Sequence, residues 1–263
     1  MTRGVVIHAA LGFPGTVITE LSGTEPWQPR ILPSAAGAAR VALVQSRASL
    51  LAGDDVTLSV VVGEGAALEL VELAATLAHH ARGGQAAVVG IEVEVGMCGS
   101  LVWLGEPLIV AAGACARRTL SLDLARAARA LLGERVVLGR AREQSGALVA
   151  RTRITCDGAP VLDETLDTRD LEVLTSAVVA GDARMVAGLS LAGARDLDAP
   201  VGAMQAEGPA TLWRSVGEAR AGGGWPDALA ARWQELAMTA PSDPFRRRQR
   251  NSRMHLEASK ATR

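Results

Sequence analysis

The chain is poor in aromatic residues and has no surplus of charge of either sign. Aromatic residues make up 3% of its 263 residues, tyrosine is absent, and 27 basic residues nearly balance 28 acidic ones. General nucleic-acid binding needs a basic surface, and stacking on bases needs aromatic side chains. We therefore expect no nucleic-acid partner. Because hydrophobic residues reach 49% without aromatics, the core must be built from Val, Leu and Ala.

Cysteine is also scarce. Cys98, Cys115 and Cys156 are widely spaced, odd in number, and form no C-x-x-C pair. Such spacing excludes a disulfide framework and suits a reducing compartment. Each cysteine is most simply a small apolar residue on a strand, with a transient metal contact as the alternative.

No apolar run is long and unbroken enough for a membrane helix. The strongest candidate, Val95–Ala116, carries one charged residue, Glu106, but several glycines and Pro107 interrupt it and its first half alternates like a strand. Val5–Ile18 is mildly apolar, yet no small-x-small cleavage site follows it. We expect a cytoplasmic protein without a membrane partner.

The most informative feature of the chain is a segment that repeats itself. LSVVVGEGAALELV (58–71) superposes on IEVEVGMCGSLVWL (91–104) at an offset of 33 residues, and LSLDLARAARALL (120–132) is a fainter third copy. Each copy has an alternating apolar run, a turn of small residues and a second apolar run. Alternation buries every other side chain, and recurrence at this length is typical of units that stack on one another. Three ordinary hairpins in an all-β domain would give a similar pattern.

The fold class is therefore mainly β, with strands stacked in a solenoid-like or β-helical sandwich. Further strands are predicted over residues 41–45, 108–112, 117–124, 135–139, 149–155 and 160–168, the last two joined by the hairpin signal Asp157-Gly158. Residues 73–81 could form a short helix or a loop. The pattern predicts one β-rich domain over residues 1–240 and an Arg-rich tail over 241–263.

A few helices are expected in the C-terminal third, where helical spacing of apolar residues replaces the strand-like alternation. Residues 170–187 are predicted to be helical. The clearest amphipathic helix is DALAARWQELAMT (227–239), where Leu229, Trp233 and Leu236 recur at helical spacing after Pro226.

The motifs of common enzymes are absent: the chain has no G-x-S-x-G, no G-x-x-x-x-G-K-[ST], no H-E-x-x-H and no G-x-G-x-x-G after a strand. We expect no catalytic activity. His79-His80 is the one histidine pair with the chemistry of a metal ligand. Adjacent residues of a strand point to opposite faces, however, so one ion could use both only in a loop.

Three acids lie where an apolar β framework would not need them. Asp54 lies at a turn, Glu106 precedes Pro107, and Glu134 lies between two apolar runs. A buried acid must be paired, protonated or next to internal water, and a passage lined with carboxylates suits divalent cations. Turn formation explains Asp54 equally well, and the two glutamates have possible ion-pair partners in Arg117, Arg118, Arg135 and Arg140.

The order of the motifs along the chain carries a family resemblance. It consists of VALVQ (41–45), Gly53-Asp54, VTLSVVVGEGAAL (56–68), AAT (74–76), WLGEPLIV (103–110), RTLSLDL (118–124), GERVVLGR (133–140) and TSAVVAGDARMVAGLSLAG (175–193). In this order and spacing, over roughly residues 40–195, the chain resembles the urease accessory protein UreD family, also called UreH.

The resemblance implies a non-enzymatic factor for assembly of the urease metallocentre. The expected partners are the urease structural subunits, a UreF-type accessory protein and, through it, a UreG-type GTPase. No cofactor is expected to be bound permanently, and nickel is expected in transit through an internal tunnel. By motif position the resemblance assigns Asp54, Thr76, Glu106 and Glu134 to that path, with His79 or His80 as possible additions. The alternative is a β-scaffold that remodels urease without contacting metal. If the repeats stack, the acids at their ends could fall along one line.

Overall fold

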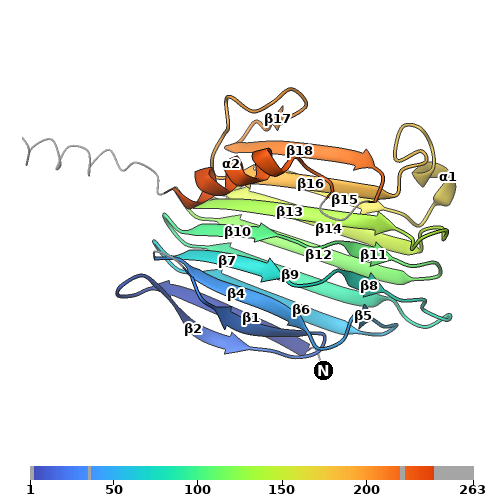
Figure 1. The fold of residues 1–263 in the computed structure, drawn as a ribbon, viewed down its shortest axis with the longest axis horizontal. Helices are drawn as coiled ribbons and strands as arrows, with labels where there is room; N and C mark the ends of the chain where they lie inside the picture. Colours follow the sequence, from blue (N-terminus) through green and yellow to red (C-terminus); the bar gives the residue numbers. More distant parts are fainter. Residues whose placement is uncertain (1–2, 35–36, 220–222, 240–263) are drawn as a thin grey trace, which may run out of the picture.

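Two sheets of stacked strands face each other and form most of the molecule (Figure 1). The computed structural model describes residues 3–34, 37–219 and 223–239. The seven-stranded sheet has the order β15-β14-β12-β9-β6-β1-β2, and the second sheet the order β17-β18-β16-β13-β10-β7-β4-β3, with β5, β8 and β11 attached. The strands of the first sheet are β1 (Arg3–Leu11), β2 (Thr16–Ser22), β6 (Asp55–Val62), β9 (Ala87–Val95), β12 (Cys115–Leu124), β14 (Ala147–Cys156) and β15 (Ala159–Asp167). Those of the second are β3 (Trp27–Leu32), β4 (Ala39–Gln45), β5 (Ser49–Leu50), β7 (Ala67–Glu72), β8 (Thr76–Ala78), β10 (Ser100–Leu104), β11 (Leu108–Val110), β13 (Arg129–Leu138), β16 (Met185–Ala192), β17 (Met204–Gln205) and β18 (Ala210–Gly217).

The sequence repeats stack as a β-solenoid, which confirms the stacked interpretation over three separate hairpins. The chain passes from the first sheet to the second within each repeat, as β6-β7, β9-β10 and β12-β13. Neighbouring turns pair in parallel: Leu58 lies opposite Ile91, and Leu70 lies opposite Trp103. Both pairs are 33 residues apart, so the offset seen in the sequence is the length of one turn. The next turn is shorter, since Trp103 lies opposite Leu132.

The inward side chains of the two sheets form one continuous core. Along β6 the residues Val56, Leu58, Val60 and Val62 are buried and their neighbours are more exposed, as the alternation predicts. Each fully buried Val or Leu contributes roughly 1.5 to 3 kcal/mol of transfer free energy. The inward face of the first sheet is therefore almost wholly apolar, and inward-facing polar residues of the second sheet are exceptions in this core.

The helix predicted over 227–239 is confirmed as α2 (Asp227–Met238), which covers the outer face of β10, β13 and β16 (Figure 1). Its buried residues Leu229 and Trp233 pack against Val102, Leu131 and Leu189 of the second sheet. The central strands of that sheet are thus buried on both faces.

The helix predicted over 170–187 is wrong for most of its length. Only α1 (Leu171–Leu174) forms there, capped by the Asp170 side chain, and turns follow until β16 begins at Met185. The reason is tertiary: β16 completes the sheet beside β13, in antiparallel pairing from Ala130–Ala192 to Val137–Met185. The ambiguous segment 73–81 is neither helix nor plain loop, because it contains the strand β8.

The remaining predictions on chain organisation have varied outcomes. Asp157 and Gly158 form the predicted hairpin turn between β14 and β15, both with positive φ (51° and 77°) as such two-residue turns require. Among the described residues no helix is long and apolar enough to cross a membrane, and Val95–Ala116 contains β10 and β11 instead. The Arg-rich tail predicted over 241–263 lies outside the described residues.

Candidate functional site

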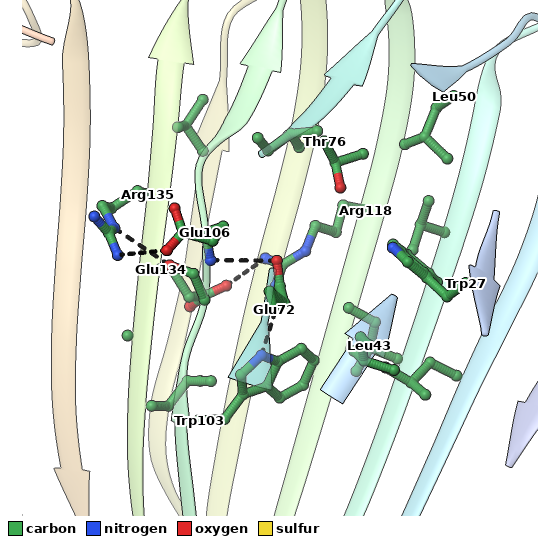
Figure 2. Close-up of a pocket in the computed structure, with 18 of the residues that line it drawn as sticks. Trp27, Leu43, Leu50, Glu72, Thr76, Trp103, Glu106, Arg118, Glu134 and Arg135 are labelled. Atoms are coloured by element: carbon green, nitrogen blue, oxygen red, sulfur yellow. Dashed lines mark hydrogen bonds and ion pairs between the residues drawn. The ribbon is translucent and has the colours of Figure 1, made fainter. Parts of the chain in front are cut away.

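A cavity of about 50 Å³ lies between the two sheets (Figure 2). A water molecule needs roughly 10 to 15 Å³ of such space, so a few could enter. The first sheet contributes Leu58, Val89 and Ile91, together with Arg118 of β12. The acids come from the second sheet and the loop that follows β10. The charged and hydroxyl-bearing residues of the lining are Glu72, Thr76, Glu106, Arg117, Arg118, Glu134 and Arg135.

Glu72 lies at the centre of this cavity and is held by two donors. It is the last residue of β7 and continues the inward face of Leu68 and Leu70. The indole Nε1 of Trp103 donates to its Oε1 at 2.9 Å, and the backbone N–H of Glu106 donates to its Oε2 at 3.2 Å (Figure 2).

Burial raises the pKa of the Glu72 carboxyl from 4.5 to about 7. The nearby Arg118 charge and the two hydrogen bonds oppose this rise, and the Glu106 carboxylate adds slightly to it. Near neutral pH this carboxyl group is therefore divided between its protonated and ionised forms.

Stacking places the acids in one row across the turns. Leu43 of β4 lies opposite Glu72 of β7. Val71 lies opposite Leu104, and Leu104 lies opposite Gly133. The next residue after each of these is Glu72, Gly105 and Glu134, so these three residues lie side by side on neighbouring turns. Glu72 and Glu134 thus occupy equivalent positions two turns apart, with a glycine between them. A Cβ atom at Gly105 would lie 3.3 Å from the Glu72 Oε1, so the glycine leaves room for the carboxylate.

Glu134 is bound from the opposite sheet. Its Oε1 accepts a hydrogen bond from the Arg118 guanidinium, and the Thr152 hydroxyl lies 3.0 and 2.9 Å from its two oxygens. The Arg118 and Glu134 side chains are each 19% exposed. This charge-assisted contact joins the two sheets across the cavity.

Glu106 is the most open of the three acids, with its side chain 39% exposed. Arg135 lies 3.9 Å from its carboxylate and donates to the Gly105 carbonyl at 3.2 Å. The Arg135 guanidinium also stacks 4.5 Å from the centre of the Trp225 ring, a cation–π contact that ties the cavity wall to the segment before α2.

A second cavity of about 220 Å³ lies beyond Glu134 and shares Arg118, Glu134 and Val136 with the first. On its far side Arg214 of β18 forms a bidentate pair with Glu164 of β15, at 3.1 and 2.7 Å. The Glu164 side chain is 42% exposed, so this cavity leads towards the surface. Carboxylates therefore follow one another from Glu72 in the first cavity to Glu164 at the outer side of the second, and Arg118 and Arg214 lie along the same line.

Similarity to known proteins assigns the chain to a family. The model of the UreD urease accessory protein family matches residues 9–254. The chain belongs to the UreD family. It is 41% identical over 176 residues to urease accessory protein UreD 1 of Streptomyces griseus. The aligned region covers 67% of this chain and 69% of that protein. It is 36% identical over 203 residues to UreD 1 of Saccharopolyspora erythraea, covering 76% of each.

Of the six residues that the sequence assigned to a metal path in this UreD family member, three line the cavity: Thr76, Glu106 and Glu134. The Thr76 hydroxyl accepts a hydrogen bond from the Gln45 side-chain amide at 2.8 Å. Glu106 and Glu134 also have the arginine partners that the sequence offered as an alternative, Arg135 and Arg118. The ion-pair interpretation is therefore confirmed for both glutamates, and the metal path stays a prediction.

Asp54, His79 and His80 do not line the cavity. The Asp54 carboxylate pairs with Arg47 and accepts the Leu51 N–H at 2.8 Å, as an acid that stabilises a turn does. The His79 N–H donates to the Leu50 carbonyl, and the His80 Nδ1 accepts the Arg82 N–H at 2.8 Å. Across the ranges that the structure describes, no group of three or more His, Cys, Asp or Glu side chains could hold a metal ion.

Glu72 was missed at the level of the sequence, although a signal for it exists. In ALELVE (67–72) the inward positions are those of Leu68 and Leu70, so the next inward position is Glu72. An acid on the apolar face of a repeat is the anomaly that period-two alternation can reveal. The line of acids expected at the ends of the repeats therefore begins at Glu72 and not at Asp54.

Proposed function

We propose that this UreD-family chain matures urease by passing nickel through the space between its two sheets. The observation that supports this most directly is the row of interior carboxylates, Glu72, Glu106 and Glu134, facing one cavity inside an otherwise apolar core. Carboxylate and hydroxyl oxygens offer weak, exchangeable contacts to a divalent cation, which suits transfer better than storage. In this role the chain has no catalytic activity of its own.

The proposed partners are the urease structural subunits and a UreF-type accessory protein that recruits a UreG-type GTPase. Support comes from large apolar side chains that the described loops leave exposed, since such groups mark protein contacts when they gather. Phe13 is 97% exposed beside Leu11 at 62%, and Val178 is 94% exposed beside Val179 at 41%.

The experiment is urease activation in a strain that lacks this chain, complemented with wild-type or variant protein, with the nickel content of purified urease as the readout. Glu134→Ala should lower that nickel content, because it removes the carboxylate that lines both cavities and would contact the passing cation. Co-purification with urease should be unchanged. The matched control is Glu92→Ala, since Glu92 is an acid on the exposed face of β9.

The second candidate is a scaffold that remodels urease without touching metal. It is favoured by the ion pairs of Glu106 and Glu134, which alone could explain why these acids are tolerated inside the protein. Under that function Glu134→Ala and Glu106→Ala would leave nickel loading at the wild-type level while the complex forms. Full loading by both variants would therefore reject nickel transfer through the interior.

A further inference from the structure

The wall between the two interior cavities is made by one ion pair and one valine. Arg118, Glu134 and Val136 are the residues that line both spaces. Val136 is 8% exposed and apolar, so it offers nothing to a cation. Any polar route from Glu72 to Glu164 must therefore pass the Arg118–Glu134 contact.

That contact engages the Glu134 carboxylate. The guanidinium binds Oε1, and the Thr152 hydroxyl shares its proton between the two carboxylate oxygens. A divalent cation arriving from the first cavity would meet a fixed positive charge before it could reach the carboxylate, and like charges in a poorly solvated interior repel strongly.

We propose that the Arg118 side chain is the gate between the two cavities, and that it closes the route past Glu134 by occupying the carboxylate on which a divalent cation would bind. That the cation is nickel on its way to urease rests on the proposed function. The masking of Glu134 rests only on the residues of the wall and can be tested without urease.

The geometry also indicates the direction in which the gate opens. On the far side Glu164 is already held by Arg214 through two hydrogen bonds. On the near side Glu72 accepts from an indole and a backbone amide, and among the described residues no arginine donates to it. The Arg118 charge already acts on the Glu72 carboxyl. Glu72 is thus the acceptor to which a released guanidinium can move, which would leave Glu134 to the cation.

The test is titration of purified full-length protein with Ni²⁺, followed by calorimetry, for the wild type and for Arg118→Met. If the gate masks Glu134, Arg118→Met should bind about one more Ni²⁺ per chain than the wild type over the same concentration range. The affinity of Glu134 for Ni²⁺ should rise roughly tenfold or more when the Arg118 charge is removed. The double variant Arg118→Met, Glu134→Gln must lose this additional ion. Sites elsewhere on the chain are common to all variants and cancel in the comparison.

The matched control is Arg151→Met. Arg151 pairs with Asp163 at 2.8 Å on the exposed β14–β15 hairpin, so its removal also frees a carboxylate but outside the cavities. It should add no tight ion. Arg118→Leu, which also removes both the charge and the donor, serves in place of Arg118→Met if the latter fails to fold, as shown by its circular dichroism.

A folded Arg118 variant that binds no more Ni²⁺ than the wild type, or a double variant that keeps the additional ion, would overturn the gate. Urease loading then separates the two proposals. If wild-type chain fails to raise the nickel content of urease while Arg118→Met gains its ion, the proposed function fails and the masking of Glu134 stands. If the chain loads urease but the variant gains nothing, nickel transfer stands without this gate.

Discussion

Glu72 illustrates how the solenoid changes the chemistry of a single side chain. Its carboxylate is surrounded by inward-facing apolar residues of both sheets, and the loss of water raises its pKa to about 7. In the unfolded chain the same group titrates near its ordinary value, about 4.3. The folded protein therefore binds more protons than the unfolded chain between these two values, and its stability must fall as the pH rises through that window.

This difference predicts a pH-dependent stability that Glu72→Gln removes. The contribution of the protonated carboxyl is complete only below the unfolded pKa; at pH 5 the wild type keeps most of it, whereas at pH 8 the buried group is ionised and the contribution is gone. Relative to Glu72→Gln, the wild type should lose on the order of 1 to 3 kcal/mol between pH 5 and pH 8, since each pKa unit corresponds to about 1.4 kcal/mol and contact with the cavity reduces the effect.

Urea denaturation of both proteins across this pH range measures the effect, and other titrating groups cancel in the difference. Glu92→Gln, on the exposed face of β9, is the control and should follow the wild type at every pH. A constant difference between the wild type and Glu72→Gln from pH 5 to pH 8 would show that Glu72 is not desolvated.

At the level of elements, the repeated strands and helix α2 were predictable, and the segment between β15 and β16 was not. The repeats could be found because alternation and the 33-residue offset are local properties of the sequence, and the offset equals the spacing of the pairs Leu58–Ile91 and Leu70–Trp103. Residues 185–187 were misassigned to a helix because the strand conformation of β16 depends on the edge that β13 offers. Helix α2 was found because a helix that covers a sheet carries its apolar stripe in its own sequence.

The same reasoning explains which parts of the candidate site escaped prediction. Thr76, Glu106 and Glu134 were assigned from motifs, and they do line the cavity. The sequence offered four arginines as partners of the two glutamates; the choice of Arg118 for Glu134 needed the register between the sheets, because the two residues lie on β12 and β13 of different sheets. No local pattern encodes that distance.

The packing of α2 gives a prediction at the scale of an element. Trp233 is fully buried, and its Nε1 donates to the Asp196 carboxylate at 2.9 Å. Trp233→Ala removes the largest side chain between the helix and the sheet and leaves this buried acid without one donor. We expect a loss of about 3 to 5 kcal/mol and a melting temperature lower by roughly 10 °C. Thermal unfolding measures both, with the exposed Glu235→Ala as a control that should remain near the wild type.

At the scale of the whole molecule, the two sheets have separate tasks. The first provides an apolar wall with one inward arginine at the cavity, and the second provides the acids. Since both cavities lie between the sheets, the proposed route runs across the solenoid turns, from the Glu72 turn to the edge formed by β15 and β18. Such a route depends on open space as much as on charge.

Val136→Phe tests whether the route needs open space at the junction of the two cavities, separately from the charges along it. Val136 lines both cavities and faces inward, so an aromatic ring there fills the junction without altering Glu72, Arg118 or Glu134. Overpacking of this kind typically costs about 1 to 3 kcal/mol, which a folded domain can tolerate. If nickel crosses the interior, urease matured with this variant should contain several-fold less nickel while co-purifying normally.

The neighbouring Val137→Phe is the matched control, because adjacent residues of a strand point to opposite faces and Val137 does not line either cavity. It carries the same change in volume on the same strand and should load nickel like the wild type. Equal nickel content of urease with both variants would mean that the junction is not on the route. A deficit confined to Val136→Phe would show that transfer needs the passage itself, because every carboxylate along it would still be in place.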